Sequence, residues 1–569
     1  MGYRFCLGAS GAGKSSELHK RVAQYARDAL ARQDFSVNFL VVVPDQYTMQ
    51  TQKEMVLAAG ECGGILNVDV LSFGRLSHRI FEEVGADERG VLDDMGKTLL
   101  LRRLVSRCRK ELTVLGNGVE RPGMIAEIKS VISEFMQYGI TPERAGNLAA
   151  GAAAGGQGGL AARLLDLKLL YEAFLEERKN RYITGEETLD LLAEAIPRSG
   201  LIRRSIVIFD GFTGFTPVQN RVLLALMQNA KEVVFSLDYA EDGGTPIRSV
   251  MQGEAYEEQD LFYLTRKTIA QICKMAGKGG IPHEEDWYIG DETKRAVPPR
   301  FAGNPALAHL EKSLFRYPVR AYRKDAAELP VHLVLASNPA AEVRQMFRKI
   351  HELIAEKGYH YRDFAIVSGN LSAYEDDIRI CAAGMGIPVY LDTNRSVLQN
   401  PLTETIRGAL EIGGGDYSYE TMFRYLRSGL TGLSEDEVDR LENYCLARGI
   451  ASRKRWETAF DDAYEPMRTR VLAQLSSLQS LGRANALERT KALYDFLAAI
   501  DAGEQMEERA QELEKRGETA AAMEYRQIYD AILHLLEELY DLLGDEKISA
   551  ADFLELVEVG FEEIRLGTL

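Results

Sequence analysis

The stretch YRFCLGASGAGKSSEL, residues 3–18, decides how the first part of the chain folds. Its first five residues are mostly apolar and form a short predicted strand. A glycine-rich turn follows, and Leu18, Val22 and Ala26 then recur every four residues, which is the spacing of an amphipathic helix. We therefore predict a strand, a tight turn and a helix in immediate succession.

The turn itself matches the pattern GxxxxGK[ST] in full, through Gly8, Ala9, Ser10, Gly11, Ala12, Gly13, Lys14 and Ser15. Glycines let the backbone wrap closely round phosphate oxygens and point N–H groups at them. The start of the following helix adds a partial positive charge. Lys14 is expected to reach the β- and γ-phosphates, and the Ser15 hydroxyl to bind Mg²⁺. The sequence thus predicts a site for ATP and Mg²⁺, against the alternative of a chance glycine-rich turn.

Further apolar runs predict a parallel α/β sheet around this unit. Residues 39–43 (FLVVV) form a continuous run that ends at Pro44, as in a strand buried on both faces. Shorter strands are expected at 68–71, 205–209 (SIVIF) and 232–237 (EVVFSL). Because strands alternate with helical patterns, the strands should pair in parallel.

Residues from about 90 to 200 carry few strand signals and are interpreted as a helical insertion. Within it, AAGAAAGGQGGLAA at 149–162 is expected to be a flexible loop. The helix over 95–112 carries a basic run, residues 102–110, which is either a solvated helix face or a phosphate-binding stripe.

The second half of the chain repeats the layout. Strands are predicted at 331–335 (VHLVL), 364–367 (FAIV) and 389–391, with a helix over 341–355 between the first two. From about 402 the pattern is helical to the end. The last residues, GFEEIRLGTL, carry no capping signal, so we expect the chain to break off within a domain.

The expected fold class is therefore α/β, with two parallel-sheet domains that each hold a helical insertion. The first domain would consist of 1–90 and 201–275 around an insertion at 91–200. An irregular connection rich in Gly, Pro and charge covers 276–328. The second domain would start at 329–402, hold its insertion at 403–550, and begin its return at 551–569.

Composition narrows the function classes. The chain has 569 residues, is 46% hydrophobic and 27% charged, and has a net charge of -17, which excludes a uniformly basic nucleic-acid clamp but not a local basic stripe. Its six cysteines lie far apart, without the short spacing of metal ligands, and suggest small buried side chains in a reducing compartment. Neither a signal peptide nor an apolar run of about 20 residues is seen, so we expect a cytoplasmic protein that does not contact a membrane.

Asp210 follows the strand at 205–209 and is expected to hold Mg²⁺ together with Ser15. The simpler alternative is a carboxylate that caps a turn.

Superfamily 1 helicases resembling UvrD and the B chain of RecBCD read DEFQD or similar here, and their Glu orients the attacking water. This chain reads DGFTGFTPVQ over 210–219, with Gly211 in place of the Glu, and glycine cannot act as a base. The next strand also ends in SLDY rather than GDxxQ, so we expect Mg·ATP binding without hydrolysis at motor rates.

Six segments resemble one family, AddB (also called RexB), the B subunit of the AddAB ATP-dependent helicase–nuclease. They are LGASGAGKS at 7–15, VVVPDQYTMQTQKEM at 41–55, VLSFGRLSHRIF at 70–81, IVIFDGFTGFTPVQ at 206–219, ASNPAAEVRQM at 336–346 and GIPVYLDTNRSVLQNPL at 386–402. The DGFTGFTP segment is the most diagnostic, because it separates this family from active helicases.

The resemblance implies two RecA-like cores of the superfamily 1 helicase type, with helical insertions. It implies an AddA-type partner subunit in a heterodimer that processes DNA double-strand breaks, and a role in scanning single-stranded DNA. Members of the family also carry a C-terminal 5'→3' exonuclease domain held by a [4Fe-4S] cluster. We expect the cluster cysteines and nuclease carboxylates to lie beyond Leu569, so that this chain has neither iron nor nuclease activity.

The same resemblance suggests DNA contacts just past the strand ends, at Tyr47, Thr48, Gln50, Ser72, Phe73, Arg75 and Arg395. For Phe73 the alternative is a core position, and for Arg75 a salt bridge.

Three functions remain open: a non-motor subunit of a break-processing helicase–nuclease, a self-sufficient DNA-dependent ATPase or helicase, and a scaffold in which the nucleotide only stabilises the fold.

Overall fold

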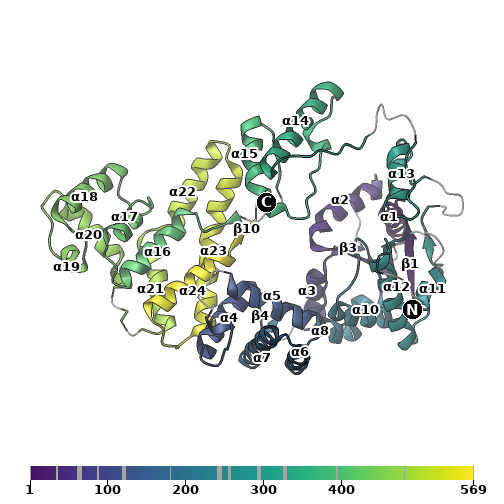
Figure 1. Cartoon of the computed structure of the whole chain (residues 1–569), viewed down its shortest axis with the longest axis horizontal. Helices are drawn as coiled ribbons and strands as arrows, with labels where there is room; N and C mark the ends of the chain where they lie inside the picture. The colour runs from purple at the N-terminus through teal and green to yellow at the C-terminus, as the bar shows by residue number, and fades with distance from the viewer. Residues whose placement is uncertain are drawn as a thin grey trace. The chain divides into compact units, whose positions relative to one another are not determined.

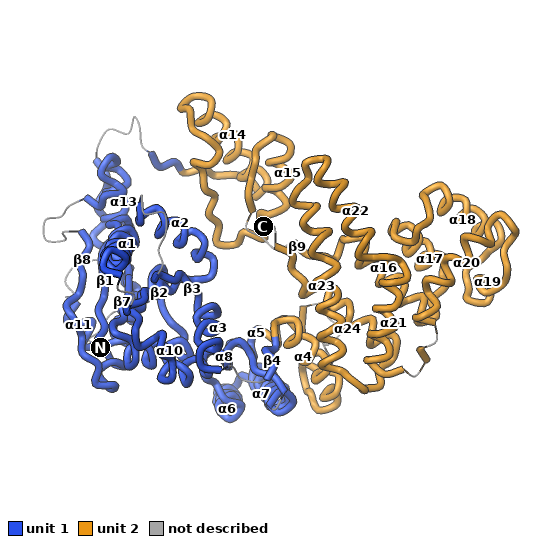
Figure 2. Tube along the Cα trace, turned by 180° about the vertical axis from the view of Figure 1, so that it is seen from behind, with its two compact units in different colours: residues 1–92, 130–332 blue, residues 93–129, 333–569 orange. Residues whose placement is uncertain are grey.

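The computed structural model of the chain describes residues 2–33, 36–60, 67–85, 89–117, 123–179, 181–239, 247–253, 258–290, 297–323, 330–391, 395–479, 481–482 and 484–567. Figure 1 labels the helices and strands, and Figure 2 colours the two compact units into which the chain divides. Unit 1 comprises Met1–Leu92 and Ser130–His332, and unit 2 comprises Asp93–Lys129 and Leu333–Leu569. Each unit therefore combines two stretches of sequence, and each is described by itself.

Unit 1 is built on a six-stranded sheet in which every neighbouring pair of strands is parallel. In spatial order the strands are β3 (Val68–Leu71), β2 (Asn38–Val42), β6 (Ser205–Phe209), β7 (Glu232–Asp238), β1 (Tyr3–Gly8) and β8 (Trp287–Tyr288). The predicted parallel α/β sheet is thereby confirmed for the first part of the chain. The sequence did not predict β8, which lies in the segment expected to be irregular.

Both faces of this sheet are buried, which explains its uninterrupted apolar runs. On one face, Cys6 of β1 shares a core with residues of α1 (Lys14–Arg32) and α2 (Thr48–Ala59). On the other face, Phe5 and Leu7 share a core with residues of α3 (Phe73–Val84), α8 (Gly185–Ala195), α10 (Pro217–Asn229) and α12 (Tyr263–Lys278). The alternation of side chains along β1 thus supplies both cores.

The alanine- and glycine-rich stretch at 149–162 is helical over most of its length, so the expectation of a flexible loop was wrong. It holds the end of α6 (Pro142–Ala154) and the start of α7 (Gly158–Arg178), with only residues 155–157 between them. Ala149 and Ala161 are buried. Alanine has the highest helix propensity of the residues, and that preference decides the structure here despite the low complexity.

Unit 1 also contains β4 (Gly90–Leu92), β5 (Tyr182–Thr184), α9 (Gly200–Arg203), α11 (Ile247–Met251) and α13 (Pro305–Ser313), and α5 covers Met124–Gln137.

Unit 2 is mainly helical, and the helical pattern predicted from about residue 402 onward is confirmed. It contains α4 (Asp94–Cys108), α14 (Pro339–Lys357), α15 (Glu375–Met385), α16 (Pro401–Gly413), α17 (Tyr419–Leu426), α18 (Glu435–Arg448), α19 (Arg453–Glu457), α20 (Glu465–Gln474), α21 (Ala486–Ala499), α22 (Ala502–Lys515), α23 (Thr519–Leu543) and α24 (Ala550–Glu563). Two short strands, β9 (Arg395–Ser396) and β10 (Arg565–Leu566), pair antiparallel.

A second parallel sheet is not confirmed. Residues 331–335, 364–367 and 389–391 form no paired strand with any residue that the structure describes. Leu333 and Leu335 are each 91% exposed and Val367 is 93% exposed. An apolar run becomes a strand only when a neighbour accepts its backbone hydrogen bonds, and the described chain provides none here. The small core of this region lies instead between α14 and α15, around Phe347 and Ile378.

The first two arginines of the basic run at 102–110 form neither a solvated helix face nor a phosphate-binding stripe, because both pair with carboxylates of unit 2. Arg102 is buried on α4 and forms an ion pair with Glu555 of α24. Arg103 forms an ion pair with Glu546 at 2.5 Å and donates to the carbonyl oxygen of Leu542 at 3.1 Å. These side chains therefore fasten the 93–129 segment inside unit 2. No helix within the described ranges has the length and apolar character needed to cross a membrane.

Candidate nucleotide-binding site

The glycine-rich turn lies between β1 and α1, which confirms the predicted order of strand, turn and helix. Gly11 has a φ of 77° and Gly13 a φ of 93°, in the left-handed region that favours glycine. The Ala12 N–H donates to the Ala9 carbonyl oxygen at 3.1 Å, and the Glu17 N–H donates to the Gly13 carbonyl oxygen at 2.9 Å. The turn is thus closed by its own backbone, and it leads directly into the N-terminus of α1.

Lys14 extends back over this turn. Its Nζ atom lies 3.0 Å from the carbonyl oxygen of Gly8 and 3.1 Å from that of Ala9, and it forms an ion pair with Asp238. The Lys14 side chain is only 11% exposed. A cationic amine is therefore already held at the turn, where a phosphate group would be bound.

Asp238 is a residue of this site to which the sequence assigned no role. It is the last residue of β7, and the parallel register pairs it with Gly8, the first residue of the turn. Ligands bind at the carboxyl ends of parallel strands, where neighbouring strands deliver their last residues to one edge. Had the order of β1 and β7 been known, the strand-end position would have marked Asp238.

Asp210 follows β6 at the same edge of the sheet. Its N–H donates to the carbonyl oxygen of Val42 at 3.1 Å, and its side chain is buried. One carboxylate oxygen lies 3.9 Å from Nε2 of His19 on α1, and Nδ1 of His19 lies 3.5 Å from a carboxylate oxygen of Glu54. Burial lowers the pKa of His19, although the Asp210 and Glu54 carboxylates act in the opposite direction. His19 is therefore best described as a neutral imidazole beside Asp210.

The buried thiol of Cys6, on β1, is influenced by both Asp210 and Lys14. Burial, and next the Asp210 carboxylate, raise the pKa of Cys6 to about 12, while the Lys14 cation opposes them. The thiol stays protonated, as expected for a small buried side chain. Lys14 begins α1 just after β1, and Asp210 directly follows the parallel strand β6, so both lie at the end of the sheet where α1 begins. Ser15, in the first turn of α1, is half-buried.

A segment of the expected irregular connection contacts the turn. The N–H of Arg300 donates to the carbonyl oxygen of Gly11 at 3.4 Å. A Cβ atom at Gly11 would lie 3.0 Å from Cβ of Arg300 and 3.0 Å from Cε2 of Phe301. Both residues belong to a single 3-10 turn, Pro299–Phe301. Sequence reasoning missed this contact, because 60 residues separate the turn from β7 and no periodic pattern links them.

The backbone conformation at Gly211, directly after Asp210, favours glycine at this position. Gly211 has a φ of 79°, and a Cβ atom there would lie 3.5 Å from Cδ of Pro44 and 3.6 Å from Cδ2 of Tyr47. The rings of Phe212 and Phe215 are tilted by 31° with centroids 5.1 Å apart, and they pack against the core of unit 1. The DGFTGFTP segment thus uses its aromatic residues to pack the domain, and Asp210 is followed by no carboxylate.

The predicted DNA contacts of unit 1 separate into buried and exposed side chains. Ser72 is buried and accepts from the N–H of Arg75 at 3.4 Å, as the N-cap of α3. Phe73 is 8% exposed, and its ring packs on that of Phe212 with centroids 5.7 Å apart. Both therefore have clear structural roles. The Arg75 side chain is exposed on α3.

The remaining candidates follow β2, apart from one in unit 2. Tyr47 is 48% exposed. Thr48 is buried and its hydroxyl donates to the Asp45 carbonyl oxygen. Gln50 is exposed and donates to Glu54 at 2.6 Å. Arg395 belongs to β9, and its side chain lies outside the described part of the structure. Among the exposed candidates of unit 1, Tyr47 has a ring that could stack on a base and Arg75 has a cation that could bind a phosphate, whereas Gln50 is already hydrogen-bonded to Glu54.

Comparison with known proteins gives a consistent result. Residues 5–311 match the family model described as "ADDB, N-terminal". Proteins named as the B subunit of an ATP-dependent helicase/deoxyribonuclease are similar to the whole chain. Those from Lachnoclostridium phytofermentans and Desulforudis audaxviator are each 33% identical and have 49% and 50% of their own length covered; the one from Desulforamulus reducens is 32% identical, with 50% covered. The chain therefore spans about half the length of the curated relatives it matches.

Proposed function

This chain belongs to the AddB family, and from that premise we propose that it is an ATP-binding, helicase-like part of a two-subunit helicase–nuclease. In this proposal it binds and scans single-stranded DNA during the processing of double-strand breaks, and an AddA-type partner drives translocation. Its relatives are each named as one subunit of an ATP-dependent helicase/deoxyribonuclease, so those proteins work with a further subunit.

One observation carries the nucleotide part of the proposal: the P-loop is fully formed, with Lys14 held on its carbonyl groups and Asp210 buried at the same edge. In our assignment the loop N–H groups and Lys14 bind the phosphates of ATP. Ser15 and Asp210 would hold Mg²⁺, which would neutralise phosphate charge there. The residues fit the ion, because the side chain that the described residues place beside the buried Asp210 carboxylate is the neutral imidazole of His19, 3.9 Å away, which leaves the negative charge for a cation to compensate.

The absence of a carboxylate after Asp210 supports a non-motor role. Positioning of the attacking water needs a polar side chain, which Gly211 cannot supply. The self-sufficient ATPase or helicase is therefore the less favoured alternative. It predicts ATP turnover that rises on addition of single-stranded DNA, whereas our proposal predicts binding with no such rise.

Calorimetry with Mg·ATP tests the binding site. Lys14→Ala should abolish binding, because the phosphates lose their cation. Lys20→Ala is the matched control, since Lys20 is an exposed lysine on the same helix. Equal affinity of the Lys14→Ala and unaltered chains would remove the basis of the proposal.

Two further measurements separate the DNA-scanning role from a scaffold that uses ATP only for stability. In a thermal shift assay a scaffold responds to ATP in the same way with and without single-stranded DNA, whereas a DNA-binding subunit responds to both. Binding of DNA through phosphate contacts should also weaken steeply from low to physiological salt. An affinity that does not change with salt would count against a phosphate-tracking groove.

A further inference from the structure

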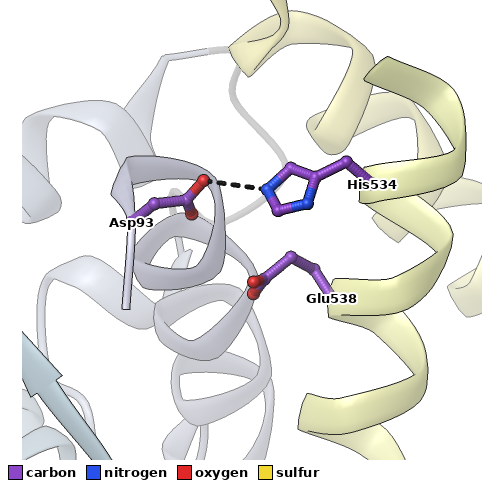
Figure 3. Close-up of side chains that lie close together, drawn as sticks. All are labelled: Asp93, His534 and Glu538. Atoms are coloured by element: carbon purple, nitrogen blue, oxygen red, sulfur yellow. Dashed lines mark hydrogen bonds and ion pairs between the residues drawn. The ribbon is translucent and has the colours of Figure 1, made fainter. Parts of the chain in front are cut away.

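Three side chains of unit 2 that the nucleotide site does not use lie close together. They are Asp93, His534 and Glu538, and one ligand atom from each lies within 4.8 Å of the other two (Figure 3). Of the described residues, only these form a His, Cys, Asp and Glu cluster of this kind. Asp93 comes from the segment 93–129 of unit 2, and the other two come from α23.

The local structure explains why the three side chains meet. His534 and Glu538 are four residues apart on α23, so both project from one face of the helix. Asp93 is the N-cap of α4, where its Oδ1 atom accepts from the N–H of Gly96 at 2.7 Å. That bond fixes the carboxylate and turns Oδ2 toward the imidazole, whose Nε2 atom is 3.3 Å away (Figure 3). Asp93 therefore has one oxygen engaged in the cap and one directed into the cluster.

Glu538 is the least exposed of the three side chains. Its side chain is half-buried and accepts no hydrogen bond from any residue that the structure describes. Glu537 also lies nearby, with one oxygen 3.9 Å from Nδ1 of His534. A partly desolvated carboxylate without a donor, beside a second carboxylate, is costly unless a cation compensates it.

We propose that Asp93, His534 and Glu538 bind a divalent transition-metal ion of the Zn²⁺ class. One imidazole nitrogen and two carboxylate oxygens form a ligand set that such ions accept, whereas Mg²⁺ prefers oxygen ligands alone. Ligands bound at about 2.0–2.2 Å lie roughly 3.4 Å apart in a tetrahedron. The exposed side chain of His534 can close the remaining distance by rotating, while the N-cap bond holds Asp93 in place, and water would complete the coordination.

The metal ion would join the start of α4 to the middle of α23. It would act with the ion pairs of Arg102 and Arg103 to hold the 93–129 segment within unit 2. Its role is therefore structural, and it does not depend on the proposed nucleotide site.

Calorimetric titration of the chelator-treated chain with Zn²⁺ tests the proposal. We expect one saturable site, weakened about tenfold or more in His534→Ala. The matched control is His78→Ala. His78 is also an exposed histidine four residues from a glutamate, Glu82, at 3.5 Å, but the described residues offer it no third ligand. This control should bind Zn²⁺ as the unaltered chain does.

Glu538→Gln keeps the test valid if His534→Ala folds poorly. Without metal this variant should melt at the same temperature as the unaltered chain or higher, since a half-buried negative charge beside Asp93 is removed. Zn²⁺ should raise the melting temperature of the unaltered chain and not that of the variant, and Mg²⁺ should raise neither. Equal Zn²⁺ affinity in all four proteins, or an equal loss in His78→Ala and His534→Ala, would overturn the proposal.

Discussion

Lys14, the first residue of α1, forms an ion pair with Asp238, the last residue of β7, the strand that pairs with β1. The pair places a negative charge beside the amine that would bind phosphate, so Asp238 and the nucleotide compete for Lys14. Nucleotide binding at this loop therefore requires Lys14 to exchange one anionic partner for another.

Asp238→Asn should consequently tighten the binding of Mg²⁺-free ADP. A unit charge a few ångströms away contributes about 1 kcal/mol in a solvated setting, which corresponds to roughly fivefold in affinity. Fluorescence titration with a labelled ADP in the presence of a chelator measures this. Asp190→Asn is the control, because Asp190 pairs with Arg221 between α8 and α10. Weaker binding in Asp238→Asn would mean that Asp238 supports the nucleotide instead of competing with it.

Gly211→Glu should not create a motor. The φ of 79° at Gly211 costs a residue with a side chain about 1–2 kcal/mol, so the variant should lose that amount of unfolding free energy in urea. The new carboxylate would also have to pass the Tyr47 ring, which lies 3.6 Å from the position of its Cβ. We expect no DNA-stimulated ATP turnover in a phosphate-release assay.

Gly214→Ala provides the comparison for this substitution. Gly214 lies in the same segment without a left-handed φ, and an added Cβ would meet only the Thr268 hydroxyl oxygen at 3.4 Å. Its unfolding free energy should therefore stay close to that of the unaltered chain. Turnover gained by Gly211→Glu would show that the missing carboxylate alone had silenced the site.

Much of this site could be predicted from the sequence for a simple physical reason. The P-loop, Asp210 and Gly211 are adjacent to strands whose apolar runs are buried on both faces, and such signals are local. Asp238 and the Pro299–Phe301 turn reach the loop through strand order and a long connection, which no local pattern encodes. Prediction of these contacts requires the topology of the sheet.

The expected second sheet shows the opposite limit. The run VHLVL at 331–335 has the composition of a buried strand, yet Leu333 and Leu335 are 91% exposed. The hydrophobic pattern of a segment indicates which side chains it could bury. Strand pairing depends in addition on a neighbouring strand, which the pattern of one segment does not reveal. The alanine-rich stretch at 149–162 was misinterpreted for a related reason, because composition was weighted above helix propensity.

The contact between the loop and Arg300 can be isolated by comparing two glycines. Gly11 and Gly13 both have a left-handed φ, but a Cβ atom at Gly13 meets nothing within 4 Å, whereas one at Gly11 meets Arg300 and Phe301 at 3.0 Å. Alanine at either position has to adopt a left-handed φ, 77° at Gly11 and 93° at Gly13. Gly11→Ala should therefore lower the urea midpoint of the nucleotide-free chain more than Gly13→Ala does. Equal losses would mean that the Pro299–Phe301 turn does not support the loop.

His19 should make the stability of unit 1 sensitive to acid. Its pKa is lowered in the folded chain from an ordinary value of 6.5, so below about pH 6.5 the unfolded chain takes up the proton more readily. The unfolding free energy should fall as the pH decreases from about 6.5, by at most about 1.4 kcal/mol per pH unit from this group. Above that pH the imidazole is neutral in both states and contributes no slope.

His19→Gln removes this proton uptake while keeping a polar side chain between Asp210 and Glu54. Urea unfolding at pH 7.5 and at pH 5.5 should therefore show a smaller pH dependence in the variant than in the unaltered chain. His78→Gln changes an exposed histidine on α3 and should leave the dependence unchanged. If His19→Gln retains the full acid sensitivity, the imidazole is not held neutral beside Asp210, and other groups must take up the proton on unfolding.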